Sequence, residues 1–254
     1  ATIVASIDLR LIEDDDDVQD FLYHSLSDTF NVFSAKNGEE GLEIATREQP
    51  NIIVCDVMMP GISGFEVTRR LKNDFMTSHI PVILLTAHSS EEHKLEGISS
   101  GADSYITKPF SVKYLKTRII KLIEQREKLQ QKFSQSFDMN TYSIHLIDKD
   151  KEFIEKIQSA ILNNLTDTDF SVDNLAEVSG IGRTFFFKKM KGITGHSPNE
   201  YINIIRMKKA AELLITSDLN VSEISYQVGI EDPSYFTRRF KAQFGKTPLQ
   251  FRKD

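Results

Sequence analysis

An aspartate at position 56 follows a short apolar run and precedes a turn signal. Residues 51–55 are Asn-Ile-Ile-Val-Cys, and Pro60-Gly61 follow two further residues after Val57. A short apolar run that stops at turn residues is typical of a buried strand in a parallel sheet. Open α/β sheets place their ligands at the carboxyl ends of such strands. A carboxylate there can attack phosphorus or bind a hard cation, or it can cap the next helix.

Other polar residues also fall where predicted strands end. Apolar runs lead into the acidic pair Glu13-Asp14, into Thr86 and into Lys108. Because the carboxyl ends of the strands meet at one edge of such a sheet, these side chains are expected near Asp56. Carboxylates brought together repel one another unless a cation lies among them, and an all-oxygen site suits Mg²⁺. With Lys108 and the Thr86 hydroxyl on the phosphoryl oxygens, the set would support phosphoryl transfer to a carboxylate.

The elements that must position these residues follow from hydrophobic periodicity. Strands are expected over residues 9–12, 30–35, 81–86 and 104–108 and in the run that ends at 56, and helices over 18–26, 38–47, 64–71, 90–98 and from 111 onward. Five strands alternating with five helices predict an α/β doubly wound five-stranded parallel sheet. Arg10 interrupts the first strand, and the sequence alone leaves open whether that strand is regular. Asp15 to Asp17 are expected to form a solvated loop and helix cap.

Residues 9 to about 130 resemble the receiver domain of two-component response regulators. The resemblance rests on four marks in order: Glu13-Asp14, Asp56 followed by Met-Met-Pro-Gly, Thr86-Ala87, and Lys108-Pro109-Phe110. Their separations of 43, 30 and 22 positions also fit that family. The fold that the resemblance implies is flavodoxin-like, in agreement with the periodicity.

The resemblance implies a phosphorylation site and a switch. Asp56 would take phosphate from a histidine kinase, and Thr86 and Lys108 would hold the phosphoryl group. Tyr105 matches an aromatic switch position, which turns inward when the threonine contacts the phosphoryl group. A cis peptide bond between Lys108 and Pro109 is also implied, and X-Pro bonds are the usual cis sites. The Mg²⁺ ligands that the resemblance implies are Glu13, Asp14, Asp56 and the Met58 carbonyl.

The composition excludes several classes of protein. Hydrophobic residues make up 40% and charged residues 27% of the 254 positions, which is ordinary for a soluble protein. No apolar run approaches the roughly 18 residues of a membrane helix, and no signal peptide is visible. A cytoplasmic location without direct membrane contact is therefore expected. The single Cys55 excludes an internal disulfide and a multi-cysteine zinc site.

The charge is unevenly distributed along the chain. Residues 1–130 carry a net charge of −7, whereas residues 171–254 carry +4. An acidic front and a basic back indicate two modules with different partners, and the basic module could meet nucleic acid. The domains expected are residues 1–124, a helical extension and linker over 125–150, and residues 151–254.

The long helix from residue 111 is expected to continue beyond the first module. Its apolar positions alternate in spacings of four and three, with Arg126 at the missing position: Leu115, Ile119, Leu122, Leu129 and Phe133. Fewer than three heptads are too few to predict a coiled coil. Two alternatives stay open, a helix packed on its own domain and then exposed, or a short dimer seam. Residues 134–150 are expected to form a linker and residues 152–165 an amphipathic helix.

The basic half contains a repeat of about 50 positions. Residues 174–181 return in similar form as residues 223–230, and Phe185-Phe186 returns as Tyr235-Phe236. Each copy predicts a helix, a turn and a second helix with basic and aromatic residues, which is the helix-turn-helix pattern. The turn glycines, Gly180 and Gly229, stand where positive φ is expected. A helix over residues 199–214 would hold the copies apart, so that both could enter successive major-groove segments of one duplex.

The second helix of each copy carries residues that could read DNA. Arginine can address guanine edges, and lysine can neutralise phosphates. The candidate contacts are Arg183, Thr184, Lys188 and Lys189 in the first copy, and Asp232, Ser234, Arg238 and Arg239 in the second. The apolar residues of the same helices are expected in the core: Phe186, Met190, Phe236 and Phe240.

Residues from about 150 to 254 resemble the AraC-type DNA-binding domain. The resemblance rests on segments spread over the whole domain, among them Phe170-Ser-Val-Asp-Asn-Leu-Ala, Ile193-Thr-Gly-His-Ser-Pro, Arg206-Met-Lys-Lys-Ala and Val221-Ser-Glu-Ile-Ser-Tyr-Gln-Val-Gly. It implies an all-α domain with two helix-turn-helix motifs that binds double-stranded DNA.

Together the two resemblances favour a two-component transcription regulator rather than an enzyme. Phosphorylation of Asp56 would shift the face bearing Tyr105, and formation of a homodimer through that face would raise the affinity for DNA. The histidine kinase could be a separate protein, or it could precede this segment in one polypeptide, as in hybrid two-component sensors anchored in the inner membrane. The start at Ala1 fits the second arrangement. Two alternatives stay open, a Mg²⁺-dependent phosphatase with an accessory domain and a phosphate-independent DNA-binding protein with a degenerate receiver.

Overall fold

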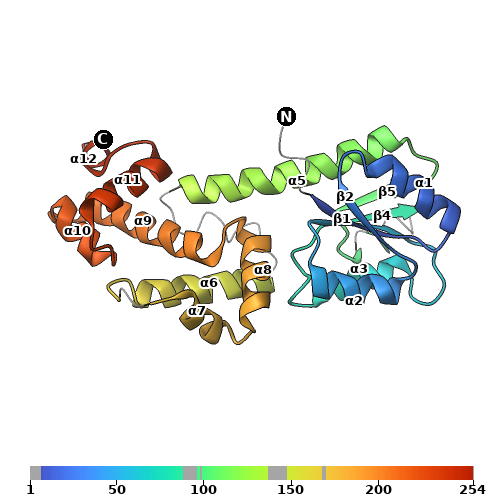
Figure 1. Ribbon diagram of the computed structural model, residues 1–254, viewed down its shortest axis with the longest axis horizontal. Coiled ribbons are helices and arrows are strands. Elements are labelled where there is room, and N and C mark those ends of the chain that lie inside the picture. The colour runs from blue at the N-terminus through green and yellow to red at the C-terminus, as the bar shows by residue number, and fades with distance from the viewer. Residues whose placement is uncertain (1–6, 88–95, 98, 137–147, 168–169, 254) are drawn as a thin grey trace. The chain divides into compact units, whose positions relative to one another are not determined.

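The computed structural model describes residues 7–87, 96–97, 99–136, 148–167 and 170–253. The chain divides into two compact units, Ala1–Arg126 and Glu127–Asp254 (Figure 1). The first unit combines strands with helices, and in the second unit every described element is a helix.

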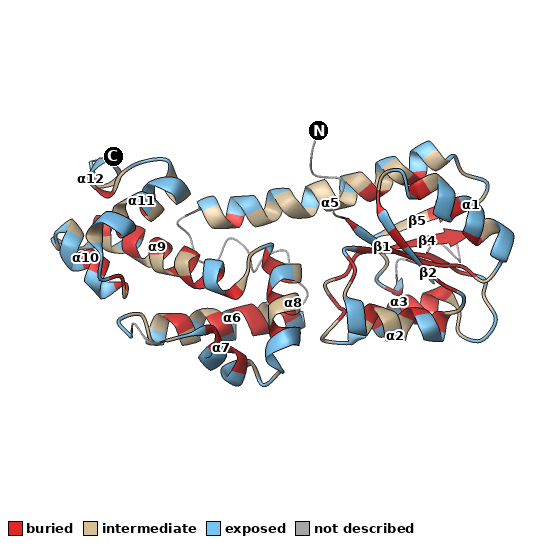
Figure 2. Cartoon of the chain, viewed as in Figure 1, coloured by how far each residue is buried: buried red, intermediate tan, exposed pale blue. Residues whose placement is uncertain are grey.

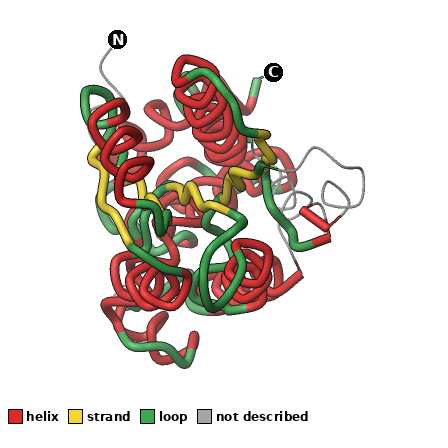
Figure 3. Tube along the Cα trace, turned by 90° about the vertical axis from the view of Figure 1, so that its right-hand side faces the viewer, coloured by secondary structure: helices red, strands yellow, loops and turns green. Residues whose placement is uncertain are grey.

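The first unit is built on a parallel sheet of five strands in the order β2-β1-β3-β4-β5. This order confirms the predicted doubly wound sheet. The strand order switches direction between β1 and β3, and such sheets hold their ligands at that switch point. Figure 3 shows the strands as a yellow layer between red helices. The strands are β1 (Asp8–Ile12), β2 (Asn31–Ala35), β3 (Ile52–Asp56), β4 (Val82–Thr86) and β5 (Ser104–Thr107).

Helices cover both faces of this sheet, and two apolar cores result. One core joins Leu11 and Val54 of the strands to helices α1 and α5 through Leu22 and Ile119. The other joins the opposite face to helices α2 and α3, for example through Leu71. Figure 2 shows the strands as largely buried. The helices are α1 (Asp16–Leu26), α2 (Gly38–Glu48), α3 (Gly64–Asn73) and α5 (Val112–Gln135), while the helix expected over residues 90–98 lies mostly outside the described residues.

The first strand is regular despite its arginine. Arg10 pairs with Phe33 of β2 on one side and with Ile53 of β3 on the other, in unbroken parallel register. The acidic run that follows begins helix α1 as expected, because the Asp15 side chain caps it and accepts a hydrogen bond from the Val18 amide. The acidic pair at the end of β1 is therefore held between a formed strand and a capped helix.

The second unit contains two copies of a three-helix motif, α6–α8 and α9–α11, followed by the short helix α12. Helices α6, α9 and α12 begin at residues 148, 198 and 248, so the repeat of 50 positions extends further back than the sequence comparison indicated. The helices are α6 (Asp148–Asn163), α7 (Val172–Ser179), α8 (Arg183–Thr194), α9 (Pro198–Thr216), α10 (Val221–Gln227), α11 (Pro233–Phe244) and α12 (Pro248–Arg252). Because α5 ends at Gln135 and α6 begins at Asp148, both ends of the predicted linker are helical.

The turns and the end of α5 show how this unit is held together. Gly180 and Gly229 have φ angles of 76° and 72°, which confirms the expected left-handed turns. Phe133 of α5 is fully buried in the unit, where its ring stacks on Tyr201 at 5.8 Å and lies 3.6 Å from Lys208 Nζ. The end of α5 is therefore part of the second unit's core. Phe133 is neither exposed nor available to a dimer seam.

Candidate functional site

Three carboxylates converge at the carboxyl edge of the central strands. Glu13 follows β1 and Asp56 is the last residue of β3, and the two are 2% and 4% exposed. Together with Asp14, each offers one oxygen, and these three oxygens lie within 4.8 Å of one another. β1 and β3 are parallel neighbours at the point where the strand order switches direction, and a crevice lies there at their carboxyl ends, so the topology itself brings the acidic residues together.

A lysine that follows the edge strand β5 contacts two carboxylates of this cluster. Lys108 follows β5, and its Nζ lies 2.5 Å from Asp56 Oδ1 and 3.1 Å from Glu13 Oε2. Burial and the neighbouring charge of Asp56 raise the pKa of Glu13 above its usual value, although Lys108 opposes this. Burial tends to lower the pKa of Lys108, but the two carboxylates outweigh it and raise that pKa. The peptide bond between Lys108 and Pro109 is cis, as expected.

The donor set fits a hard divalent cation. Carboxylate oxygens are the ligands that Mg²⁺ prefers, and three of them face one point here. The raised pKa of Glu13 reflects the cost of holding these groups together in a buried place, which a cation would relieve. The Met58 amide donates a 2.9 Å hydrogen bond to Asp56 Oδ2, so the loop that carries Met58 folds over the aspartate.

Glycine is required where this loop enters helix α3. A Cβ atom added to Gly64 would lie 2.2 Å from the carbonyl oxygen of Asp56. Any side chain there would push the start of α3 away from the end of β3. The position therefore keeps the loop between them closed over the acidic cluster.

The two remaining predicted residues lie on the neighbouring strands. Thr86 is the last residue of β4 and is fully buried. Tyr105 of β5 is half-buried, and its ring stacks on Phe65 with a centroid distance of 6.5 Å. A Cβ atom added to Gly97 would lie 2.7 Å from the Tyr105 ring, so the ring packs closely against backbone.

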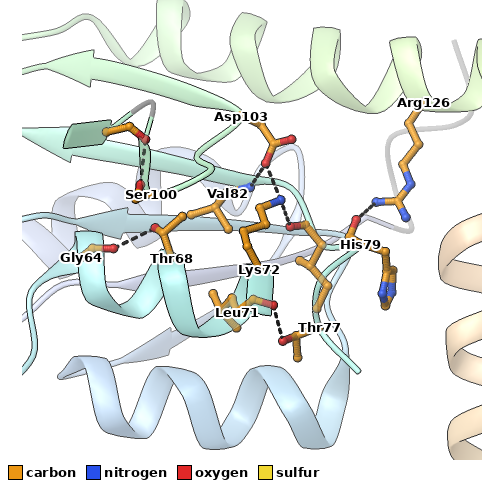
Figure 4. A network of polar contacts seen from close by, with 12 residues as sticks. Gly64, Thr68, Leu71, Lys72, Thr77, His79, Val82, Ser100, Asp103 and Arg126 are labelled. Carbon is orange, nitrogen blue, oxygen red and sulfur yellow. Dashed lines mark hydrogen bonds and ion pairs between the residues drawn. The ribbon is translucent and has the colours of Figure 1, made fainter. Parts of the chain in front are cut away.

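A polar network at the opposite edge of the sheet fixes these two strands (Figure 4). Lys72 Nζ lies 2.8 Å from the Ile80 carbonyl oxygen and 2.8 Å from Asp103 Oδ2. The same carboxylate oxygen accepts a hydrogen bond from the Val82 amide. Helix α3 is thereby tied to the beginnings of β4 and β5, which sets the level at which Thr86 and Lys108 emerge.

The DNA-reading candidates lie on the second helix of each copy, and most are accessible. Arg183 begins α8, and its side chain is 63% exposed and forms a 2.7 Å ion pair with Asp173. Asp232 caps α11 and accepts a 2.8 Å hydrogen bond from the Ser234 amide. Thr184, Ser234 and Arg238 are exposed, and Lys188 is partly exposed. The structure thus leaves an accessible row at the start of each helix.

Lys189 is a correction to the predicted set. Its side chain is fully buried, and its Nζ lies 2.6 Å from Asp150 Oδ1 in α6. A lysine held in this way cannot reach a phosphate, so the prediction that it contacts DNA is wrong. The equivalent Arg239 is partly buried, and its Cζ lies 5.7 Å from the centre of the Tyr235 ring.

The core residues of the reading helices were predicted correctly, but two surface aromatics were missed. Phe186, Met190, Phe236 and Phe240 are fully buried. Phe185 and Tyr235 occupy equivalent positions in the two copies and are 40% and 37% exposed. Each stands one residue before a core phenylalanine, and a helix turns by about 100° per residue. That rotation was the available signal that these two rings face away from the core.

The fold and its sites define a receiver-like α/β domain joined to a pair of helix-turn-helix motifs. The family model described as "Response regulator receiver domain" matches residues 9–120, and the model described as "Helix-turn-helix domain" matches residues 175–254. No helix in the described part of the chain has the length and apolar character needed to cross a bilayer.

Known proteins resemble this chain over different extents. "Histidine kinase P4" of Formosa agariphila is 39% identical over 96% of this chain, which spans only 18% of that protein. "Probable transcriptional regulator ycf27" of Cyanidium caldarium is 30% identical over 76% of this chain and 77% of its own length. The solved receiver domain of Francisella response regulator 1452 is 31% identical, covers 47% of this chain and 98% of its own, and has a TM-score of 0.45. The chain belongs to the two-component response regulators, with a receiver domain followed by an AraC-type helix-turn-helix domain.

Proposed function

We propose that this chain is a phosphorylation-regulated, DNA-binding transcription regulator, and not an enzyme. A histidine kinase gives its phosphoryl group to Asp56, so that the phosphorus–nitrogen bond of the phosphohistidine breaks as a bond to an Asp56 carboxylate oxygen forms. The observation that carries the proposal is the convergence of three carboxylates with Lys108, which touches both Asp56 and Glu13. Such a set suits the transfer of an anionic group to an anionic acceptor.

Each residue of the cluster has a role in this proposal. Lys108 neutralises the phosphoryl oxygens after leaving its contact with the unmodified aspartate, and Thr86 donates its hydroxyl to them. The Met58 amide keeps Asp56 oriented through its 2.9 Å hydrogen bond. The residues that would hold Mg²⁺ are Glu13, Asp14, Asp56 and the Met58 carbonyl. When bound, the cation supplies the positive charge that lets a phosphoryl anion approach the carboxylates.

The output of the proposed switch is DNA binding. Phosphorylation adds close to two negative charges at Asp56, which draws Thr86 inward and lets Tyr105 turn. A homodimer through the face bearing Tyr105 would then present the reading helices to double-stranded DNA. The proposed DNA contacts are Arg183, Thr184, Lys188, Asp232, Ser234 and Arg238, with Arg239 near them but partly buried.

The kinase is either a separate protein or part of the same polypeptide. The similarity to a protein named as a histidine kinase, of which this chain matches a small part, supports the second arrangement. In that case the regulator would act from the inner membrane, and otherwise from the cytoplasm. The domain limits proposed are residues 1–124 for the receiver, 125–150 for the helical extension and linker, and 151–254 for the DNA-binding domain, which packs as one compact unit with residues from Glu127 onward.

The test compares DNA affinity with and without beryllofluoride and Mg²⁺, using a site selected from random DNA. Shifting the active fraction from 1% to 99% requires about 5.5 kcal/mol of preference for the active state, so a large response is measurable. We expect tighter binding with beryllofluoride and no response in Asp56→Asn. Asp17→Asn, an exposed aspartate on α1, is the matched control and should respond normally.

Two other results would replace the proposal. DNA affinity that is the same with and without beryllofluoride would indicate a phosphate-independent regulator. Repeated hydrolysis of a phosphomonoester, rather than one acyl phosphate per chain, would indicate a phosphatase.

A further inference from the structure

An arginine occupies a core position of the receiver sheet without a charged partner. Arg10 is 6% exposed, although it stands in the middle of β1 between Phe33 and Ile53. Its Nη1 lies 3.5 Å from the Ser34 carbonyl oxygen, at the limit of a hydrogen bond. Its Nε has no hydrogen-bond partner, and no ion pair joins it to a carboxylate in the described part of the chain. Burying an unpaired charged group in this way is costly.

A cavity opens beside this guanidinium. Its volume is about 390 Å³, and it is lined by Arg10, Phe33, Ile44, Arg47 and Pro50, with Asp8 and Glu48. The lining comes from β1, β2, α2 and the loop after α2, and none of these residues belongs to the acidic cluster at the carboxyl ends of the strands. Pockets for small molecules span roughly 300–1,000 Å³ and combine apolar walls with a few polar groups, so this cavity has suitable size and character.

The cavity is accessible from solvent. Phe33 is 48% exposed, and the side chains of Arg47 and Glu48 are 61% and 51% exposed. Arg47 is already paired with Glu48 at 2.8 Å and with Glu43 at 3.5 Å. The Arg10 Cζ lies 5.2 Å from the centre of the Phe33 ring, but among the described cations of this cavity Arg10 is the one without an ion pair.

We propose that this cavity binds a small organic monocarboxylate with an apolar body. The carboxylate lies against the Nη groups at the end of the Arg10 side chain, because a guanidinium offers parallel donors that match carboxylate geometry, whereas the Nε is fully enclosed by protein. The apolar body packs against Phe33, Ile44 and Pro50. This site is separate from the phosphorylation site and uses none of its residues. Burial lowers the pKa of Arg10, as expected for a guanidinium that has lost water without gaining a carboxylate.

The remaining charges of the cavity favour a single negative charge on the ligand. Asp8 and Glu48 line the same cavity, and both act on the Arg10 guanidinium through space. The Asp8 and Glu48 carboxylates would repel a phosphate dianion more strongly than a ligand with one negative charge. A single carboxylate matches the charge of Arg10. A neutral ligand would leave the arginine unsatisfied.

The test is isothermal titration calorimetry of the full 254-residue chain with phenylacetate, phenyl phosphate and 2-phenylethanol. We expect saturable binding of phenylacetate, with the phosphate and the alcohol weaker. Arg10→Met should weaken phenylacetate binding at least about tenfold, because a charge-assisted hydrogen-bonded contact is lost. The methyl resonance of Ile44 should shift during the titration of the native chain and stay in place in the variant.

Controls separate this proposal from a simple structural role. Arg69→Met removes an exposed arginine of α3 that does not line the cavity, and it should bind phenylacetate as the native chain does. Arg10→Met should also raise the melting temperature of the ligand-free chain, since it removes an unpaired buried charge. Equal phenylacetate affinity in Arg10→Met, equal affinity for the alcohol, or no saturable binding to the native chain would each overturn the proposal. The last result would mean that water alone satisfies Arg10.

Discussion

The two helix-turn-helix copies place equivalent charged residues in different surroundings. In the first copy, Lys189 of α8 and Asp150 of α6 form a fully buried ion pair at 2.6 Å. Fifty positions later, Arg239 of α11 and Glu200 of α9 occupy the same places. Glu200 instead accepts hydrogen bonds from the backbone and hydroxyl of Ser197, and these bonds lower its pKa.

This difference shows that the repeat keeps positions and changes how the reading helix is held. In the first copy, a buried ion pair joins α8 to α6. The second copy relies on aromatic packing, in which the Phe240 ring contacts Phe236, Phe244 and Phe251 at centroid distances of 5.8, 4.7 and 5.4 Å. Lys189 and Arg239 align in the two copies, but they are held by different contacts.

The largest effect is expected from breaking the buried pair. Lys189→Met removes the ammonium group that contacts Asp150 in the core, and removing one member of a buried pair costs about 3–5 kcal/mol. Arg239→Met should cost about 1 kcal/mol or less, because Glu200 keeps its bonds to Ser197. Urea unfolding of both variants measures the difference in the free energy of unfolding.

The double variant Asp150→Leu/Lys189→Met controls for the loss of charge. Replacing both partners with apolar residues is often neutral, so most of the stability should return. Equal losses in Lys189→Met and Arg239→Met would show that the two copies are held in the same way.

A smaller difference is expected in DNA affinity when the first arginine of each reading helix, Arg183 in α8 and Arg238 in α11, is replaced. Arg183 is paired with Asp173 in the free protein, whereas Arg238 is exposed and forms no ion pair among the described residues. A base-contacting arginine is worth about 1–3 kcal/mol. Arg238→Ala should therefore weaken DNA binding more than Arg183→Ala, and Asp173→Asn should strengthen it.

Fluorescence anisotropy at fixed salt on the selected site measures these affinities. Arg69→Ala, on α3 of the receiver unit, is the matched control and should leave them unchanged. A larger loss in Arg183→Ala than in Arg238→Ala would reverse the assignment.

The sequence predicted the features that depend on local patterns, and it did not predict those that depend on contacts between residues far apart in the chain. The sheet order and the meeting of Glu13, Asp14, Asp56 and Lys108 followed from local apolar runs, because parallel topology brings strand ends together. The burial of Lys189 against Asp150 could not be predicted in the same way. Its partner lies 39 positions earlier, on a helix that was expected to begin only after that partner.

The same reasoning explains the other differences. Arg10 was recognised as unusual, but the cavity beside it depends on how α2 packs over β1 and β2, which no periodicity reveals. The alternative of a dimer seam on α5 failed at Phe133, because the aromatic and cationic neighbours of that ring come from α9. Local sequence patterns predicted the helices and strands. Packing between distant segments determined which of their faces are exposed to solvent.

Helix caps offer a more modest test of the comparison. Ser197 is the N-cap of α9 and Thr247 is the N-cap of α12, and each forms a capping box, with Glu200 and Gln250 respectively. Losing such a cap costs about 0.5–2 kcal/mol. Ser197→Ala should be the more destabilising of the two in urea, because α9 is shared by both copies and α12 is a short terminal helix. Equal costs would mean that the second copy depends on α12 as much as on α9.

The smallest effect concerns pH and a pair of residues just after the reading helices. His196 of the first copy has a buried Nε2 without a hydrogen-bond partner, and burial lowers its pKa, although Glu200 opposes this. The equivalent Lys246 is exposed. Because the neutral imidazole is favoured in the folded state, the unfolded chain binds more protons. The stabilising contribution is thus fully present above the unfolded pKa of about 6.5 and is lost as pH falls below it.

Urea unfolding at pH 7.5 and 5.5 isolates this contribution. The native chain should lose stability between these values, and His196→Gln should lose less, because it lacks the buried imidazole whose lowered pKa disfavours protonation in the folded state. His24→Gln, at an exposed position on α1, should keep the full pH dependence. If His196→Gln loses as much stability as the native chain, the histidine is hydrated in solution and the first copy is no more tightly closed than the second.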